Sequence, residues 1–372
     1  MLINIGCRVN RSEGESLLRF FKEKYPDSEI IVVNTCVVTR TAEARSRKAI
    51  RKILRERPDA RVIVTGCLQF YQPLFDGVEW LSMTEKEKIA NNFYPLTRRS
   101  RYYLKIEDGC DRGCHYCVVA KIRGGPRSKP FSKILAEIDY AKEEGFPEIV
   151  LVGVNLGLYD GGLERLIRRI GEIPDLPRIR LSSIEPDAIT PDLIHALKDI
   201  PFCRHLHLAL QHTESDVLMA MGRPLVDLDR TFGLINSIDK LNIGSDIIVG
   251  YPGETEHDFQ EMVQKLKDLP ICYLHVFPYS PRPGTKAFQL SDSIPPEIKR
   301  GRVKVLRGLS SEKRRSYAKL FLGIQLEVVV EKRNGAFYGL SDNYLKIRLR
   351  EPVDGDLIMV VPKRIVGDEI LS

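Results

Sequence analysis

Apolar, β-branched runs alternate with amphipathic stretches through the first part of the chain. The apolar runs span 2–6, 29–33 and 61–65. Between them, residues 12–24 and 40–57 have the spacing of amphipathic helices. Crossovers of this kind join parallel strands, so the pattern predicts a small α/β unit at the amino terminus.

A second alternation begins near residue 101 and predicts a barrel. It contains six strand candidates: Tyr102 to Ile106, Ile149 to Val152, Ile179 to Ser182, His205 to Leu210, Ile247 to Val249 and Tyr273 to Phe277. Helical stretches separate them at 131–145, 162–171, 190–199, 227–240 and 256–268. This repeat is typical of a (β/α)6 partial barrel, whose active site lies at the carboxyl ends of the strands.

The last part of the chain changes character twice. Residues 299–319 hold nine basic residues and one acid, Glu312, and we expect a helical hinge with a basic face. Apolar runs follow at Leu326 to Glu331, Phe337 to Leu340, Tyr344 to Leu349 and Leu357 to Val361. These four runs are separated by no helices, and we predict a small β-barrel of five short strands in this part of the chain.

These patterns divide the 372 residues into four parts. We expect an amino-terminal α/β domain at 1–95, a barrel domain at 96–298, the basic hinge at 299–319 and the small β-barrel at 320–372. The first residues resemble no secretion signal, and no apolar run reaches membrane-spanning length, so we expect a cytoplasmic protein with no membrane partner. In that reducing compartment, the eight cysteines are better explained as metal ligands or packing residues than as disulfides.

Three cysteines follow the first barrel strand at the spacing C-x3-C-x2-C. They are Cys110, Cys114 and Cys117, with the aromatic Tyr116 before the last. Such a loop can hold three corners of a 4Fe-4S cubane and leave the fourth iron for S-adenosylmethionine (SAM), as in radical SAM enzymes. A structural zinc site is the alternative, but it usually needs a fourth protein ligand, for which His115 is the only neighbour.

Three further cysteines each stand one to three residues past a strand of the amino-terminal unit. They are Cys7, Cys36 and Cys67. Because those strands are predicted to be parallel, we expect the three thiols to meet at one edge and to hold a second 4Fe-4S cluster. Individually, each could be a packing residue, as we expect for Cys203 and Cys272.

Polar and small residues follow several of the barrel strands, where SAM would bind. The candidates are Gly153, Asn155, Ser183, Glu185, Gln211, Arg223 and Asp246. Glycine lets the backbone approach a ligand, and the polar groups suit a ribose or a carboxylate. Each could equally be a loop cap.

With these cysteines assigned, the chain resembles the methylthiotransferase family of radical SAM enzymes over essentially its whole length. The amino-terminal motifs are Gly6-Cys7-Arg8-Val9-Asn10, Asn34-Thr35-Cys36-Val37-Val38-Thr39 and Thr65-Gly66-Cys67. The barrel entry is Asp108-Gly109-Cys110 to Cys117, with Arg123-Gly124. The tail resembles a TRAM domain at Leu322-Gly323 and Gly339-Leu340-Ser341-Asp342-Asn343-Tyr344.

Within the family, Thr39 and the run Ser46-Arg47-Lys48 resemble the branch that modifies N6-threonylcarbamoyladenosine in tRNA. The branch that acts on isopentenyladenosine usually has Arg where Thr39 stands. Two features depart from the family: only 42 residues separate Cys67 from Cys110, and the run 210–214 is Leu-Gln-His-Thr-Glu in place of Leu-Gln-Ser-Gly-Ser. The second departure bears on the SAM contacts near Gln211.

The resemblance implies attachment of a methylthio group to carbon 2 of the modified adenosine at position 37, beside the tRNA anticodon. Two SAM molecules are consumed: one methylates sulfur carried on the second cluster, and the other yields the radical that removes hydrogen from the base. The partners implied are a tRNA anticodon stem-loop, an electron donor and a sulfur source, and we expect no DNA partner. The net charge of +7 permits RNA binding.

Four other functions stay open on the sequence, and one of them is methylthiolation of isopentenyladenosine in tRNA. The family branch that methylthiolates an aspartate of a ribosomal protein has the same clusters and tail. A cobalamin-dependent radical SAM enzyme would leave Cys7, Cys36 and Cys67 unexplained, and the chain has no Asp-x-His-x-x-Gly motif in its amino-terminal domain. A non-catalytic RNA-binding iron-sulfur protein would need no SAM-like barrel.

Overall fold

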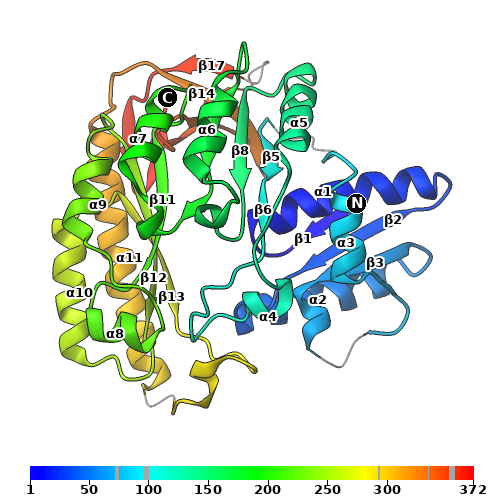
Figure 1. The fold of residues 1–372 in the computed structure, drawn as a ribbon, viewed down its shortest axis with the longest axis horizontal. Helices are drawn as coiled ribbons and strands as arrows, with labels where there is room; N and C mark the ends of the chain where they lie inside the picture. The colour runs from blue at the N-terminus through cyan, green and yellow to red at the C-terminus, as the bar shows by residue number, and fades with distance from the viewer. Residues whose placement is uncertain (72–74, 96–99, 292–293, 334, 352–356) are drawn as a thin grey trace.

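The computed structural model describes residues 1–71, 75–95, 100–291, 294–333, 335–351 and 357–372 (Figure 1). The expected boundary between residues 95 and 96 therefore lies next to a segment, 96–99, that is outside the described ranges. Within these ranges, no helix is long and apolar enough to cross a membrane.

The amino-terminal unit is a parallel sheet in the order β1-β2-β3-β4. Its strands are β1 (Leu2–Asn4), β2 (Ile30–Thr35), β3 (Arg61–Gly66) and β4 (Glu79–Trp80). Its helices are α1 (Arg8–Lys24), α2 (Arg40–Glu56) and α3 (Met83–Ala90). The first three strands and first two helices were predicted, whereas β4 and α3 were not.

Helix α1 begins at Arg8, four residues earlier than its sequence pattern predicts. The cap is the Cys7 side chain, whose Sγ accepts from the Asn10 backbone N–H at 3.5 Å, so none of the usual oxygen-bearing cap residues marks the start. The first two turns also bury the polar residues Asn10, Ser12 and Glu13. An apolar periodicity therefore cannot reveal these turns.

The middle of the chain forms two parallel sheets that share one interrupted strand. The strands are β5 (Tyr102–Lys105), β8 (Glu148–Val152), β9 (Arg178–Leu181), β10 (Ser183–Ile184), β11 (His205–Gln211), β12 (Asn242–Val249) and β13 (Tyr273–Pro278). Only Ser182 separates β9, which pairs with β8, from β10, which pairs with β11. All six predicted strand segments are present and pair in chain order.

The five predicted helices of this region are also present. They are α5 (Phe131–Glu143), α6 (Leu163–Gly171), α7 (Pro191–Lys198), α9 (Leu228–Ile235) and α10 (Glu256–Asp268). The sequence analysis did not predict two short helices, α4 (Val119–Arg123) and α8 (Ser215–Ala220). It also did not predict the antiparallel pair of β6 (Glu107–Asp108) and β7 (Arg127–Ser128). In Figure 1, α9 and α10 lie on the side of the strands that faces away from the amino-terminal unit.

The two faces of these strands differ in chemistry. Along β12, Ile243, Ile247 and Val249 belong to the main apolar core beneath the helices. Because side chains alternate between faces, Asp246 points to the opposite, inner face. The inner face of β12 therefore carries a polar side chain, whereas its outer face is apolar.

The basic segment is helix α11 (Pro296–Lys319), and it packs along β13. The Ser310 hydroxyl accepts from the Leu274 N–H at 2.8 Å and lies 3.2 Å from the Leu274 carbonyl. Arg302 is buried in an ion pair with Glu254 at 2.9 Å, and Lys299 is also buried. The predicted helix is therefore present, but part of its basic face is turned into the protein.

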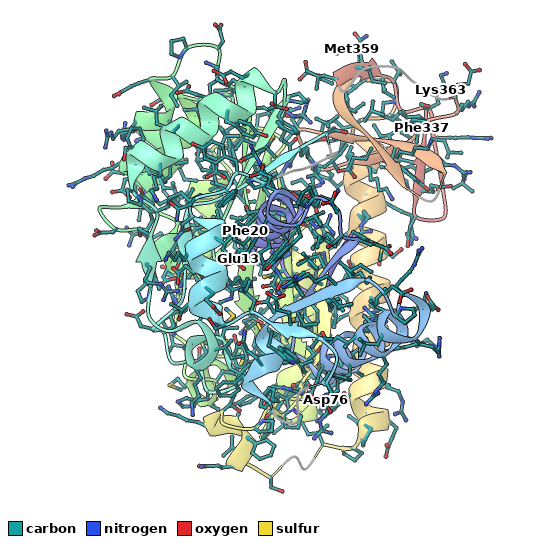
Figure 2. The ribbon with its side chains drawn as sticks, turned by 90° about the vertical axis from the view of Figure 1, so that its right-hand side faces the viewer. Glu13, Phe20, Asp76, Phe337, Met359 and Lys363 are labelled. Atoms are coloured by element: carbon teal, nitrogen blue, oxygen red, sulfur yellow. The ribbon has the colours of Figure 1, made fainter. Side chains whose placement is uncertain are left out.

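The tail is one six-stranded sheet in the order β17-β14-β15-β16-β19-β18. The strands are β14 (Leu326–Arg333), β15 (Ala336–Ser341), β16 (Lys346–Arg348), β17 (Leu357–Val360), β18 (Arg364–Val366) and β19 (Glu369–Leu371). The prediction of five strands was wrong by one. Neither β18 nor β19 lies in a predicted apolar run, because each has only three residues and begins with a charged one. Figure 2 shows this sheet, with Phe337, Met359 and Lys363 labelled, above the end of α11.

The turn between β15 and β16 contacts the barrel strands. Arg180 donates to the carbonyls of Ser341 and Asp342, each at 3.0 Å. The Tyr344 ring stacks on His205, with centroids 4.0 Å apart. The tail is thus fixed to the inner face of the barrel strands by buried hydrogen bonds.

Candidate iron-sulfur and cofactor site

The loop with Cys110, Cys114 and Cys117 follows β6 and is held by backbone hydrogen bonds. The Cys110 N–H donates to the Gly124 carbonyl at 3.0 Å, and the Cys117 N–H donates to the Cys114 carbonyl at 3.0 Å. Burial raises the pKa of the Cys110 thiol and raises that of Cys117 to about 11. Cys110 and Cys117 therefore need a positive charge beside them, such as that of a metal centre, to become thiolates.

A single structural zinc ion would need a fourth protein ligand beside the three cysteines of this loop. His115 is an unsuitable fourth ligand, since its Nδ1 lies 2.9 Å from the Ala220 carbonyl and its Nε2 lies 3.4 Å from Lys286 Nζ.

Four of the residues predicted to bind SAM lie beside this loop. The Arg223 guanidinium is 3.4 Å from the Tyr116 hydroxyl, 3.5 Å from Glu185 Oε1 and 3.7 Å from Cys114 Sγ. The Asn155 amide nitrogen is 4.0 Å from Cys110 Sγ. These side chains come from four separate segments of the chain, so only the fold brings them together.

Gly153 is packed against an acid that the sequence analysis missed. A Cβ at Gly153 would lie 2.8 Å from Glu107 Oε2, and the same oxygen accepts from the Asn155 N–H at 2.8 Å. Burial raises the pKa of Glu107 to about 7. Its position just past the first barrel strand was the signal that could have identified it.

The other three predicted SAM contacts are Ser183, Gln211 and Asp246. Ser183 Oγ lies 3.1 Å from His207 Nδ1, and Asp246 Oδ1 lies 3.4 Å from His275 Nδ1. Gln211 has a positive φ of 69°, and the pairing of β11 with β12 shifts register between Leu208 and Gln211. Binding of SAM by Ser183, Gln211 and Asp246 stays a prediction.

The second set of cysteines lies at the carboxyl edge of the amino-terminal sheet. Cys36 and Cys67 directly follow β2 and β3, whose last residues pair in register as Thr35 and Gly66. A Cβ at Gly6 would lie 2.7 Å from the Cys36 Cβ, so the turn that carries Cys7 is packed against Cys36. Burial, followed by the neighbouring Cys67, raises the pKa of Cys36 to about 12. The turn that carries Cys7 therefore lies with Cys36 and Cys67 at one edge of the sheet, and their binding of a cluster stays a prediction.

A buried ion network joins the amino-terminal unit to the barrel. Glu13, on α1, is 1% exposed and lies 2.6 Å from Lys86, 3.0 Å from Lys105 and 3.1 Å from Arg123 (Figure 2). Although burial favours protonation, Arg123, Lys86 and Lys105 hold the pKa of Glu13 well below its usual range. Arg123 also forms an ion pair at 2.7 Å with Asp108, which stands two residues before Cys110. The network therefore fixes one set of cysteines relative to the other.

Comparison with known proteins gives matches over most of the chain. The family model of the radical SAM superfamily matches residues 104–266, and that of the uncharacterized protein family UPF0004 matches residues 1–74. The threonylcarbamoyladenosine tRNA methylthiotransferase MtaB of Chlamydia pneumoniae is 33% identical, covering 90% of this chain and 87% of the relative. Its counterpart in Bacillus subtilis is 30% identical, covering 96% and 92%.

The chain is also similar to a methylthiotransferase of another kind and to a solved structure. The ribosomal protein uS12 methylthiotransferase RimO of a Hydrogenobaculum species is 30% identical, covering 90% of this chain and 88% of the relative. The radical SAM methyltransferase TsrM of Kitasatospora setae, solved with cobalamin and a [4Fe-4S] cluster, aligns with a TM-score of 0.56. That alignment covers 77% of this chain and 76% of TsrM at 13% identity, so it speaks for the fold alone.

Proposed function

Because this chain belongs to the methylthiotransferase family of radical SAM enzymes, we propose that it adds a methylthio group to carbon 2 of N6-threonylcarbamoyladenosine at position 37 of tRNA. The observation that carries this proposal is the presence of two separate cysteine sets joined through the Arg123 network. One set lies at the carboxyl edge of the amino-terminal parallel sheet, and the other lies in the loop after β6. The MtaB relatives supply the choice of substrate.

We assign one 4Fe-4S cluster to each cysteine set. Cys110, Cys114 and Cys117 would hold the cluster that binds SAM, and Cys7, Cys36 and Cys67 would hold the second. When bound, these groups supply reductive cleavage of SAM, which gives the radical that removes hydrogen from the base, and the sulfur that is transferred. Three thiols per set fit this role, because each set leaves one iron without a protein ligand.

The surrounding side chains would orient SAM. The Asn155 amide, beside Cys110, offers a donor and an acceptor, and its backbone is fixed by the hydrogen bond to Glu107. The Arg223 guanidinium is held by Glu185 and by the Ala209 carbonyl, so its position next to Cys114 is fixed before a ligand arrives. A pre-positioned cation suits the carboxylate of SAM.

We infer a domain arrangement that keeps the expected boundaries. The six parallel strand segments support a (β/α)6 partial barrel at 96–298, following the amino-terminal domain at 1–95. The six-stranded terminal sheet supports a TRAM-like domain at 320–372. Helix α11, which holds the basic hinge at 299–319, connects the two and packs on the barrel.

We further propose that the terminal sheet and α11 bind the backbone of the tRNA anticodon stem-loop. Of the two arginines in the densest basic stretch, Arg314 is exposed and has its guanidinium 5.5 Å from the Tyr273 ring. Arg315 lies 3.1 Å from Asp368, and the negative charge of Asp368 weakens the attraction between Arg315 and a phosphate. An electron donor and a sulfur source complete the expected partners.

Nucleoside mass spectrometry of tRNA from a deletion strain tests this function. We expect loss of 2-methylthio-N6-threonylcarbamoyladenosine, with its precursor accumulating, and restoration by the intact gene. The matched control is the gene with the exposed residue Glu23 changed to Gln, which should also restore the product. Unchanged tRNA with loss of methylthio-aspartate from ribosomal protein uS12 would favour the second candidate function, which rests on the similarity to RimO.

A further inference from the structure

Three side chains from neighbouring strands converge on the inner face of the barrel. They are His207 on β11, Asp246 on β12 and His275 on β13. Asp246 Oδ1 is 3.7 Å from His207 Nε2 and 3.4 Å from His275 Nδ1, and one ligand atom from each residue lies within 4.8 Å of the others. Asp246 pairs directly with His275 in the strand register, so the backbone fixes this spacing.

The buried histidine of this trio is oriented with one nitrogen unused. His207 Nδ1 contacts the Ser183 hydroxyl at 3.1 Å, whereas its Nε2 is buried with no hydrogen-bond partner in the described structure. A second contact that fixes the ring and leaves the other nitrogen for a metal is typical of metal-binding histidines. The ring of Tyr273, the first residue of β13, has its centroid 5.7 Å from that of His207 and 5.3 Å from that of His275, so it restricts both imidazoles.

The spacing suits a small divalent ion. Zinc bonds of 2.0–2.1 Å to nitrogen and oxygen place tetrahedral ligand atoms about 3.4 Å apart. The two measured separations of 3.4 and 3.7 Å are close to this value. Two histidines and one carboxylate leave a fourth position open, as in catalytic zinc sites.

We propose that His207, Asp246 and His275 bind a zinc ion inside the barrel, separate from the six cluster cysteines. The side chains of His275 and Asp246 are 48% and 24% exposed, so the fourth position faces solvent-accessible space. That position takes an oxygen ligand, either water or a carboxylate. This site goes beyond the proposed methylthio transfer and does not depend on which molecule is modified.

The test uses the anaerobically reconstituted, full-length protein, equilibrated with zinc and then gel-filtered. Zinc and iron are counted together by mass spectrometry, and X-ray absorption at the zinc edge identifies the ligands. We expect about one zinc per chain, bound by nitrogen and oxygen only. His275→Ala and Asp246→Asn should lose this zinc while keeping the iron content of the unmodified protein.

The matched control is His257→Ala, which removes an exposed histidine of α10 that is not a member of the trio. It should keep the zinc. The proposal is overturned by an absence of zinc, by sulfur among the zinc ligands, or by equal zinc in His275→Ala and the control. Since His275 is half-exposed, His275→Ala should fold even if Asp246→Asn does not, and iron content together with circular dichroism reports this.

Discussion

Changing Glu13 to Gln should loosen the amino-terminal unit from the barrel. Three buried cations, Lys86, Lys105 and Arg123, face two carboxylates, Glu13 and Asp108. Asp108 still pairs with Lys105 and Arg123 after the change, so Lys86, which is fully buried, loses its carboxylate and keeps only amide oxygens at 3.3 Å. Breaking a buried ion pair from one side costs about 3–5 kcal/mol.

Native-state hydrogen exchange of the reconstituted protein measures this cost locally. Peptides that cover α1 and α3 should exchange roughly a hundredfold faster or more, because about 1.4 kcal/mol corresponds to a factor of ten. The matched control is Glu23→Gln on the same helix, which removes an exposed pair with Arg19 at 2.9 Å. Exposed pairs of this spacing contribute about 0.3–0.5 kcal/mol, so the control should change exchange less than threefold.

Adding Lys86→Met to Glu13→Gln should recover part of the loss. The double variant removes both the unpaired cation and its partner, and a buried pair replaced by apolar atoms is often neutral. Equal exchange in Glu13→Gln and Glu23→Gln would refute the reasoning. So would a double variant that exchanges faster than Glu13→Gln alone.

Four further predictions follow from the two cysteine sets and their surroundings. Iron analysis should give about eight irons per chain and about four when one set is replaced by Ala, since each set holds one cubane; the residues replaced are Cys110, Cys114 and Cys117. Arg223→Lys should raise the KM for SAM by about tenfold in a 5′-deoxyadenosine assay, because lysine cannot form the forked contact; an unchanged KM would contradict this role. Glu107→Gln should stabilise the protein by up to about 3 kcal/mol above pH 7 and little below pH 4.5, measured by unfolding at several pH values. The sign follows because burial raises its pKa from 4.5 to about 7, so the carboxylate form that exists above that range opposes folding. Replacing Arg314 and Arg315 together by Ala should weaken tRNA binding and flatten its salt dependence without changing SAM cleavage in the absence of RNA; unchanged binding at two salt concentrations would remove α11 from the interface.

Most strands and both cysteine sets can be predicted from short stretches of the sequence. Each barrel strand is an apolar run bounded by a helical stretch, and the spacing of Cys110, Cys114 and Cys117 is contained in one loop. The proximity of Cys36 and Cys67 could be predicted, because parallel strands end at the same edge of a sheet. These features require no knowledge of contacts between distant residues.

The features that escaped prediction depend on distant partners. Glu13 looks like a surface residue of α1 until Lys86, Lys105 and Arg123 surround it. The sequence analysis named Asp246 only as a SAM contact and did not name His207 or His275, because the three are separated by 39 and 29 positions along the chain. Chain composition cannot show that the turn at 341–345 is packed on Arg180, because that contact uses backbone carbonyls.

The measurement that tests the central claim most directly is a product analysis of Cys36→Ala with SAM, reductant and tRNA that carries N6-threonylcarbamoyladenosine. The unmodified protein should form both 5′-deoxyadenosine and the methylthiolated nucleoside. Cys36→Ala, with about four irons retained, should still form 5′-deoxyadenosine but no methylthiolated nucleoside, because it lacks a ligand of the second cluster. Methylthiolation by Cys36→Ala, or loss of both products with the barrel cluster intact, would contradict the assignment of two clusters to two tasks.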